Sequence, residues 1–244
     1  MTETIQRSSR YRSVEEVVRE INGMGIGGRI QRYPVEYDIN EMLQYVKAFG
    51  DYHTGNFKLT ENNKFLYVNL IKWLMGDSSC QCLSPSTRDR LIPADLSAGI
   101  YIGGKTGTGK TVATRILCDL ARMVQPPYFF NGKSNTICWR DLRADEIVES
   151  FSHGKYDSTL NTVAFLSIQD LGSEPNEAMD MGNRQNVIKQ LLEKRADNGA
   201  ATIITSNYPL CSNAIVQLYG DRIQSRLMSS CNYFELHGDD YRKR

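Results

Sequence analysis

The feature that most constrains this chain is the run GKTGTGKT at residues 104–111. It satisfies the pattern G-x-x-x-x-G-K-[ST], which marks a phosphate-binding loop when a strand precedes it and a helix follows it. An apolar run at residues 98–102 leads into the loop, and an amphipathic segment at residues 109–124 follows it. The context therefore predicts a P-loop nucleotide-binding fold.

The composition of the loop fits contact with phosphate. Glycines let the backbone turn its N–H groups toward an anion, and the start of a helix adds a favourable dipole. Lys110 is expected to offset the charge of the β- and γ-phosphates, and the Thr111 hydroxyl to ligate Mg²⁺. ATP and Mg²⁺ are thus the predicted cofactors. The predicted nucleotide-binding residues are Gly104, Thr106, Gly107, Thr108, Gly109, Lys110, Thr111 and Val112.

Short apolar runs alternate with helical patterns from residue 98 onward. Alternation of this kind predicts a parallel sheet with helices on both faces, and hence an α/β, three-layer αβα fold with a five-stranded parallel sheet. The predicted strands are 99–102, 136–139, 162–168, 201–205 and 233–236; the predicted helices are 109–124, 144–151, 183–195 and one that begins at Asn213.

The first part of the chain lacks this alternation. A capping-box pattern at Ser13–Glu16 predicts a short helix that ends at Gly23. The G-x-G-x-x-G match at residues 23–28 follows a helix instead of a strand, so we interpret it as a hinge and not as a dinucleotide site. Further helices are predicted at 38–49 and 60–75, with loops at 50–58 and 76–97.

Polar residues follow two of the predicted strands. Parallel sheets bind ligands at the carboxyl ends of their strands, so Asp170 is predicted to be the acid of the nucleotide site and its Mg²⁺ ligand. Glu174 is either a second site acid or an ordinary loop residue. Asn207 is expected to orient the attacking water, the alternative being a simple turn before Pro209.

Two arginines, Arg222 and Arg226, lie four positions apart and would share one face of a helix. Such a pair is either a solvated surface feature or a means of reaching the γ-phosphate held by a neighbouring subunit.

Charge and composition exclude several classes of protein. With 29 Lys and Arg against 28 Asp and Glu, the chain is no bulk polycation, so DNA binding would need a local patch or an oligomer. The basic residues Arg184, Lys189, Lys194 and Arg195 are unranked candidates for it. No apolar stretch is long enough for a transmembrane helix and the start of the chain lacks the apolar core of a secretory signal, so we expect a cytoplasmic protein without membrane contact. The six cysteines are expected to be reduced, without a metal site.

In order, the runs GKTGTGKT, DLGSEP, ATIITSNYP and YGDRIQSRL resemble the DnaC/IstB-like branch of AAA+ ATPases, which comprises bacterial and phage helicase loaders and transposition helper ATPases. The resemblance extends from about Leu59 to the C-terminus. It implies an AAA+ ATPase core at 58–244 without a full C-terminal lid, and a small helical N-terminal extension at 1–57 that binds a partner. It also implies Walker A roles for Lys110 and Thr111, a sensor role for Asn207, and an arginine finger at Arg226 with Arg222 beside it.

One departure from that family concerns the metal. The family usually carries two acids before the Leu/Ile-Gly pair, whereas this chain has Gln169 and Asp170. A neutral amide is a poor partner for Mg²⁺. Either Asp170 both holds Mg²⁺ and polarises the attacking water, or ATP hydrolysis is slow and the motif indicates nucleotide binding more than turnover.

Three functions remain open at this stage. The first is an ATP-dependent helicase loader that forms a homo-oligomer, grips single-stranded DNA and delivers a replicative helicase. The second is a transposition helper that assembles on duplex DNA and recruits a transposase. The third is a nucleotide-regulated scaffold with little turnover, which the neutral Gln169 favours.

Overall fold

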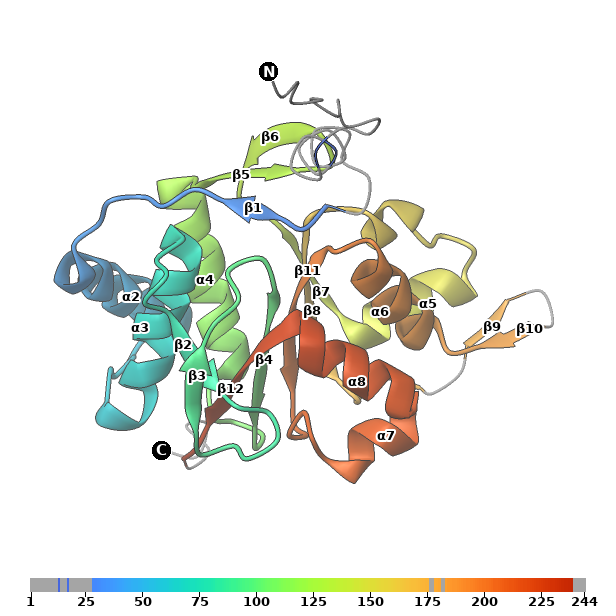
Figure 1. Ribbon diagram of the computed structural model, residues 1–244. Coiled ribbons are helices and arrows are strands. Elements are labelled where there is room, and N and C mark those ends of the chain that lie inside the picture. Colours follow the sequence, from blue (N-terminus) through green and yellow to red (C-terminus); the bar gives the residue numbers. More distant parts are fainter. Residues whose placement is uncertain (1–12, 14–16, 18–27, 176–177, 181–182, 239–244) are drawn as a thin grey trace, which may run out of the picture.

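The computed structural model describes residues 13, 17, 28–175, 178–180 and 183–238. Apart from single positions, the predicted helix after Ser13 and the glycine run at 23–28 lie outside these residues. The described chain forms three layers, with a central sheet between two groups of helices (Figure 1). The helices are α2 (Ile39–Thr54), α3 (Glu61–Met75), α4 (Lys110–Val124), α5 (Ala144–Ser152), α6 (Val187–Asp197), α7 (Asn213–Tyr219) and α8 (Asp221–Ser230), with a 3₁₀ turn at Ser158–Asn161.

The central sheet has seven strands in the order β3-β2-β12-β4-β11-β8-β7. Five neighbouring strands are parallel to one another, which confirms the predicted five-stranded parallel sheet: β12 (Cys231–Leu236), β4 (Gly99–Gly104), β11 (Ala201–Ser206), β8 (Phe165–Leu171) and β7 (Arg140–Arg143). The other two strands, β2 (Gln81–Leu83) and β3 (Leu91–Pro93), form an antiparallel hairpin. The expectation of an unstructured connection at 76–97 is therefore wrong.

The strand predicted at 136–139 is also wrong. Residues Lys133–Thr136 are β6, which pairs with β5 (Pro127–Phe130), and β5 pairs in turn with β1 (Gln31–Arg32) in a separate small sheet. The parallel edge strand is instead the polar β7. An edge strand has a single neighbour and needs no continuous apolar run, while the apolar Ile137 and Trp139 are buried without belonging to a strand.

Two helix boundaries differ from expectation. Helix α6 begins at Val187, where the side chain of Asn186 accepts a hydrogen bond from the backbone of Lys189, whereas residues 183–185 form β10 and pair with β9 (Ala178–Asp180). Helix α2 continues to Thr54 and ends at Gly55, whose φ of 75° is the left-handed conformation that glycine adopts without strain. The predicted loop at 50–58 is therefore largely helical.

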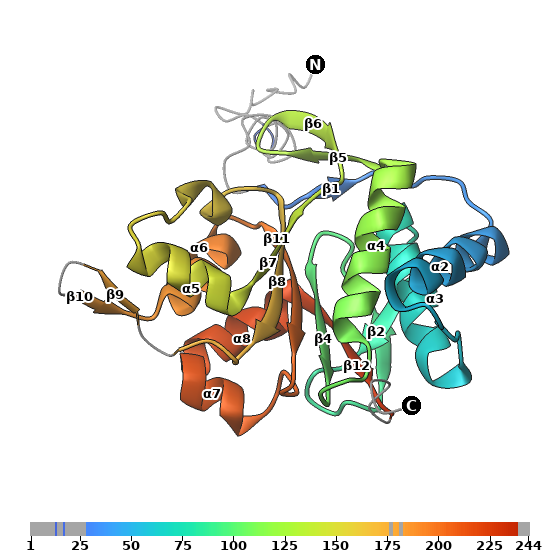
Figure 2. The same cartoon turned by 180° about the vertical axis from the view of Figure 1, so that it is seen from behind.

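Helices α2, α3 and α4 lie on one side of the sheet and α5, α6, α7 and α8 on the other, as the two opposite views show (Figures 1 and 2). The strands alternate accordingly: on β4, Ile100 and Ile102 join the core on the α4 side, and Tyr101 joins the core on the other side. Met42 and Val46 of α2 belong to the α4-side core. Part of the segment 1–57 thus packs against the α4 side of the sheet, and a partner for this segment stays a prediction.

Within the described residues, no helix is both long and apolar enough to span a lipid bilayer.

Candidate functional site

The P-loop connects β4 to α4 at the carboxyl edge of the sheet. Gly107 and Gly109 have φ angles of 81° and 93°, which a residue with a Cβ rarely adopts. Gly104 also leaves no room for a side chain, because a Cβ there would lie 2.5 Å from the backbone oxygen of Leu236. Sequence and backbone therefore agree that the loop needs its glycines.

A cavity of about 590 Å³ opens beside the loop. Six of the eight predicted nucleotide-binding residues line it, and Gly104 and Thr108 do not. The lining residues are Thr54, Thr106, Gly107, Gly109, Lys110, Thr111, Val112, Arg143, Asp170, Ser173 and Asn207.

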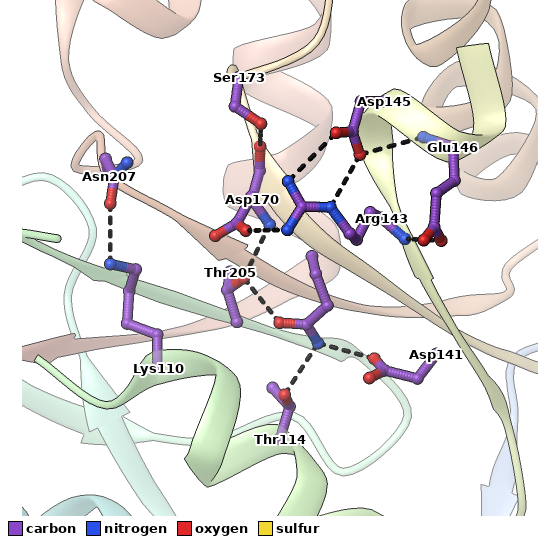
Figure 3. A network of polar contacts seen from close by, with 11 residues as sticks. Lys110, Thr114, Asp141, Arg143, Asp145, Glu146, Asp170, Ser173, Thr205 and Asn207 are labelled. Atoms are coloured by element: carbon purple, nitrogen blue, oxygen red, sulfur yellow. Dashed lines mark hydrogen bonds and ion pairs between the residues drawn. The ribbon is translucent and has the colours of Figure 1, made fainter. Parts of the chain in front are cut away.

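Lys110 and Asn207 meet across this cavity although 97 positions separate them in the sequence (Figure 3). The Lys110 Nζ donates to Asn207 Oδ1 at 2.9 Å, and also to the backbone oxygens of Gly104 and Lys105 at 2.8 and 2.9 Å. The ammonium group is therefore held at the mouth of the P-loop, where anionic oxygens of a phosphate could take the place of neutral ones.

Asp170 lies at the end of β8 and points into the same cavity. Its φ of 57° is in the left-handed region, and the register between β8 and β11 shifts at this point. The Thr205 hydroxyl accepts a hydrogen bond of 2.9 Å from the Asp170 backbone N–H, and Ser173 Oγ donates to its backbone oxygen at 2.7 Å. These contacts hold the unusual backbone conformation, which turns the carboxylate toward the cavity.

Gln169 has the opposite orientation. Its side chain lies on the α4 side of the sheet and is only 3% exposed. Its Oε1 accepts from the Thr205 hydroxyl at 2.9 Å, while its Nε2 contacts oxygens of Thr114, Asp141 and Ser167 at 2.7–2.8 Å. Both ends of the amide are thus engaged in a buried network beneath the cavity.

The residues present do not fit a tightly held Mg²⁺. The cavity wall offers the Thr111 hydroxyl and the Asp170 carboxylate, but the Gln169 oxygen is buried and already accepts a hydrogen bond. In the described part of the chain, no group of three or more His, Cys, Asp or Glu side chains is placed to hold a metal. The wall itself thus offers Mg²⁺ one carboxylate and one hydroxyl, and every other ligand would have to come from water or from the phosphates of a ligand.

Sequence reasoning missed one charged residue of the site, Arg143, at the end of β7 (Figure 3). Its Nε and Nη2 donate to the two carboxylate oxygens of Asp145 at 3.0 and 3.1 Å, and its Nη1 lies 3.4 Å from Asp170 Oδ2. The bond to Asp145 raises the pKa of Arg143, and reciprocally lowers that of Asp145. No local sequence pattern indicates this residue, because its strand is polar and begins just after residues 136–139, which were predicted to be the strand.

Glu174 lies outside the cavity. It is 9% exposed and accepts two hydrogen bonds, one of 2.8 Å from the Gly172 backbone N–H and one from the Tyr219 hydroxyl. Burial, followed by the nearby carboxylate, raises the pKa of Tyr219 well above its ordinary value. These contacts favour the interpretation of Glu174 as a loop residue over its interpretation as a second acid of the site.

Arg222 and Arg226 also lie outside the cavity, on α8. Arg222 Nη2 is 3.1 Å from Glu193 Oε1, and Arg226 donates to the Glu193 backbone oxygen at 3.2 Å and to the Asp197 carboxylate. Both arginines are thus tied to α6 of the same chain.

Among the candidate DNA contacts, Arg195 is excluded. It is fully buried, whereas Lys189 and Lys194 are exposed. A side chain sealed inside the fold cannot reach nucleic acid.

A second cavity of about 350 Å³ adjoins the P-loop on the α2 and α3 side and shares Thr54, Gly109 and Val112 with the first. Phe57, Tyr67, Thr60 and Asn63 are among its other lining residues. Apolar walls with a few polar groups are typical of a small-molecule pocket.

No protein-family profile matches the chain, and no curated protein matches it in sequence. Among solved structures, the crystal structure of the DnaC helicase loader matches with a TM-score of 0.51 and 16% identity, over 80% of this chain and 99% of that one. DnaI (TM-score 0.48, 17% identity, 76% and 88% covered) and a primosome component from Streptococcus pyogenes serotype M3 (0.49, 14%, 73% and 81%) also match. The DnaC match shows a common fold, and at that level it confirms the resemblance to the DnaC-like AAA+ ATPases.

Proposed function

We propose that this chain, which has the fold of the DnaC-type AAA+ ATPases, is an ATP-binding replication protein of the helicase-loader type. The meeting of Lys110, Asp170 and Asn207 around one cavity carries the proposal. A lysine, a carboxylate and an amide are groups that neutralise phosphates and orient a water for attack on them. The common fold with the DnaC helicase loader supports the loader role.

The two adjoining cavities fit the two ends of a nucleotide. The larger holds the cationic and acidic groups and suits the phosphates, while the smaller, with Phe57, Tyr67 and Val112 in its wall, suits the base. Their shared residues, Thr54, Gly109 and Val112, lie where the ribose would pass from one to the other.

Hydrolysis in an isolated subunit is expected to be slow. Asp170, the sole carboxylate among the described residues that line the cavity, lies beside Arg143, and Gln169 is committed elsewhere. This arrangement favours, as a second candidate, a nucleotide-regulated scaffold with little turnover.

Faster turnover would need a group from outside the subunit. We infer that Arg226 provides it to a neighbour in an ATP-dependent homo-oligomer, with Arg222 beside it. Arg226 would have to leave Asp197, which is an exposed partner. A guanidinium supplied in trans is worth about 10³–10⁵ in rate in enzymes that transfer phosphoryl groups.

The loader role is tested with the replicative helicase encoded in the same genome. We expect ATP, and not ADP, to promote capture of that helicase on single-stranded DNA, and Lys110→Ala to abolish the effect. Preference for duplex DNA together with a transposase would favour the transposition helper instead. If the helicase were captured equally well with ATP, with ADP and without nucleotide, the role assigned to ATP would be contradicted.

Subunit cooperation has its own test. Arg226→Ala and Lys110→Ala proteins should each be inactive in ATP turnover, and their mixture should regain activity because an intact P-loop can meet an intact finger. Absence of complementation, with activity per subunit independent of concentration, would refute action in trans.

A further inference from the structure

The larger cavity is lined by more cationic than anionic side chains. Among the described residues of its wall, Lys110 and Arg143 are cations and Asp170 is the one anion. The side chains that line the wall therefore carry a net positive charge before any ligand binds, with the carboxylate of Asp145 behind Arg143. A polyphosphate, with three or four negative charges, is attracted by such a wall without an added cation.

Gln169 reinforces this imbalance. To offer its oxygen to a metal, the side chain would have to give up the hydrogen bond from Thr205 and rotate its amide away from Thr114 and Asp141. The buried Thr205 O–H would then lose its acceptor, and a buried donor without an acceptor is unfavourable. The network thus resists recruitment of Gln169 to the metal.

Arg143 is held in place before the ligand arrives. Asp145 accepts hydrogen bonds from two nitrogens on one edge of its guanidinium, so that the third nitrogen, Nη1, is presented to the cavity beside Asp170. A guanidinium has five N–H donors in a rigid plane, and the contacts described here use three of them. The planar fork suits phosphate oxygens, and its fixed position reduces the entropy lost on binding.

We propose that Arg143 supplies, in place of a tightly bound Mg²⁺, the second positive charge that the nucleotide's phosphates require. The chain then binds a nucleoside triphosphate with little dependence on Mg²⁺. This inference rests on the proposed nucleotide binding and adds to it the form of the ligand, a metal-free polyphosphate.

The experiment measures the Kd of a fluorescent ATP analogue in millimolar Mg²⁺ and in excess EDTA. For the unmodified chain, we expect the two Kd values to differ by less than about fivefold. Arg143→Gln should weaken binding at least about tenfold in EDTA and recover most of the loss in Mg²⁺, because Asp170 is then free for the metal. Gln169→Asp should make binding depend on Mg²⁺, since it adds a carboxylate beneath the cavity.

Two further variants separate charge from folding. Arg140→Gln is the matched control, because Arg140 lies on the same strand, pairs with Asp157 and does not line the cavity; it should bind as the unmodified chain does in both buffers. Arg143→Lys keeps the charge without the fork and should lose less affinity than Arg143→Gln. Urea unfolding establishes that each variant is folded.

A difference of fivefold or more between the buffers for the unmodified chain would overturn the proposal, as would an Arg143→Gln protein that binds normally in EDTA. If the unmodified chain binds the analogue in neither buffer, the proposed nucleotide binding itself fails, and that outcome is distinct from a dependence on metal.

Discussion

The β8–β11 pair has a buried polar cluster at each of its two ends, and the two clusters differ in what they face. At the carboxyl end, Gln169 ties β8 to β11, β7 and α4 beneath the cavity beside the P-loop. At the amino end, the fully buried Arg195 of α6 ties β11 to Val163, which precedes β8.

Arg195 is bound by neutral oxygens. Its donors reach Thr202 Oγ1 at 2.9 Å, the backbone oxygens of Leu160 and Ala201 at 2.6 Å, and that of Val163 at 3.0 Å. Burial lowers its pKa to about 10. Four of its five N–H donors are used in this way, and the fully buried cation holds backbone segments together out of reach of a ligand.

The comparison shows that burial of a polar group does not by itself indicate function. Both clusters satisfy their hydrogen bonds, but one borders a cavity with Lys110 and Asp170 in its wall and the other is sealed. We therefore expect changes at the amino end to alter stability alone, and changes at the carboxyl end to alter nucleotide binding.

The largest effect is expected from Arg195→Met. Removal of the guanidinium leaves three backbone oxygens and the Thr202 hydroxyl without their donor. At about 1–3 kcal/mol for each unsatisfied buried group, partly relieved by relaxation, the free energy of unfolding should fall by about 3–4 kcal/mol. Urea denaturation measures it, and a loss below about 1 kcal/mol would mean that the cluster is not structural.

Next comes Lys110→Ala at the other end. Loss of the ammonium group should weaken ATP binding by about 100-fold, or about 2.7 kcal/mol, since it removes a charge-assisted contact to phosphate. Titration with a fluorescent nucleotide measures the Kd, and Lys189→Ala, an exposed lysine on α6, serves as control. Affinity equal to that of the unmodified chain would remove the central residue of the proposed site.

Thr205→Val is a smaller change in the polar cluster around Gln169, at the carboxyl end of the β8–β11 pair. The hydroxyl accepts from the Asp170 backbone and donates to Gln169, so its loss frees the strained end of β8. We expect a decrease of about 1–2 kcal/mol in unfolding free energy together with a several-fold change in nucleotide Kd. A change in stability with the Kd unaltered would show that Asp170 needs no such support.

Thr202→Val is the matched change three residues earlier on the same strand, and it has the smallest expected effect. It removes one of the four acceptors of Arg195 and should cost about 1 kcal/mol of stability. The nucleotide Kd should stay within experimental error of the unmodified value. If both threonine variants altered the nucleotide Kd equally, the assignment of stability to the amino end and of nucleotide binding to the carboxyl end would be wrong.

The sequence by itself determined the P-loop, four of the five parallel strands in outline, and the polar residues that end β8 and β11. These features follow from local rules: glycine where φ is positive, apolar runs for central strands, and periodicity 3.6 for helices. Helix α3 was bounded correctly, because Thr60 and Gly76 mark its ends within the sequence itself.

The tertiary structure alone decided which charges share the cavity. Arg143 lies on an edge strand that has no apolar signature, and its meeting with Asp170 depends on β7 and β8 being neighbours in the sheet. Likewise, neither the burial of Arg195 nor the engagement of Gln169 can be read from a single segment, because their partners come from distant positions on other strands and helices. Residue type fixes the hydrogen-bonding capacity of a side chain, but strand order and register determine the atoms it meets.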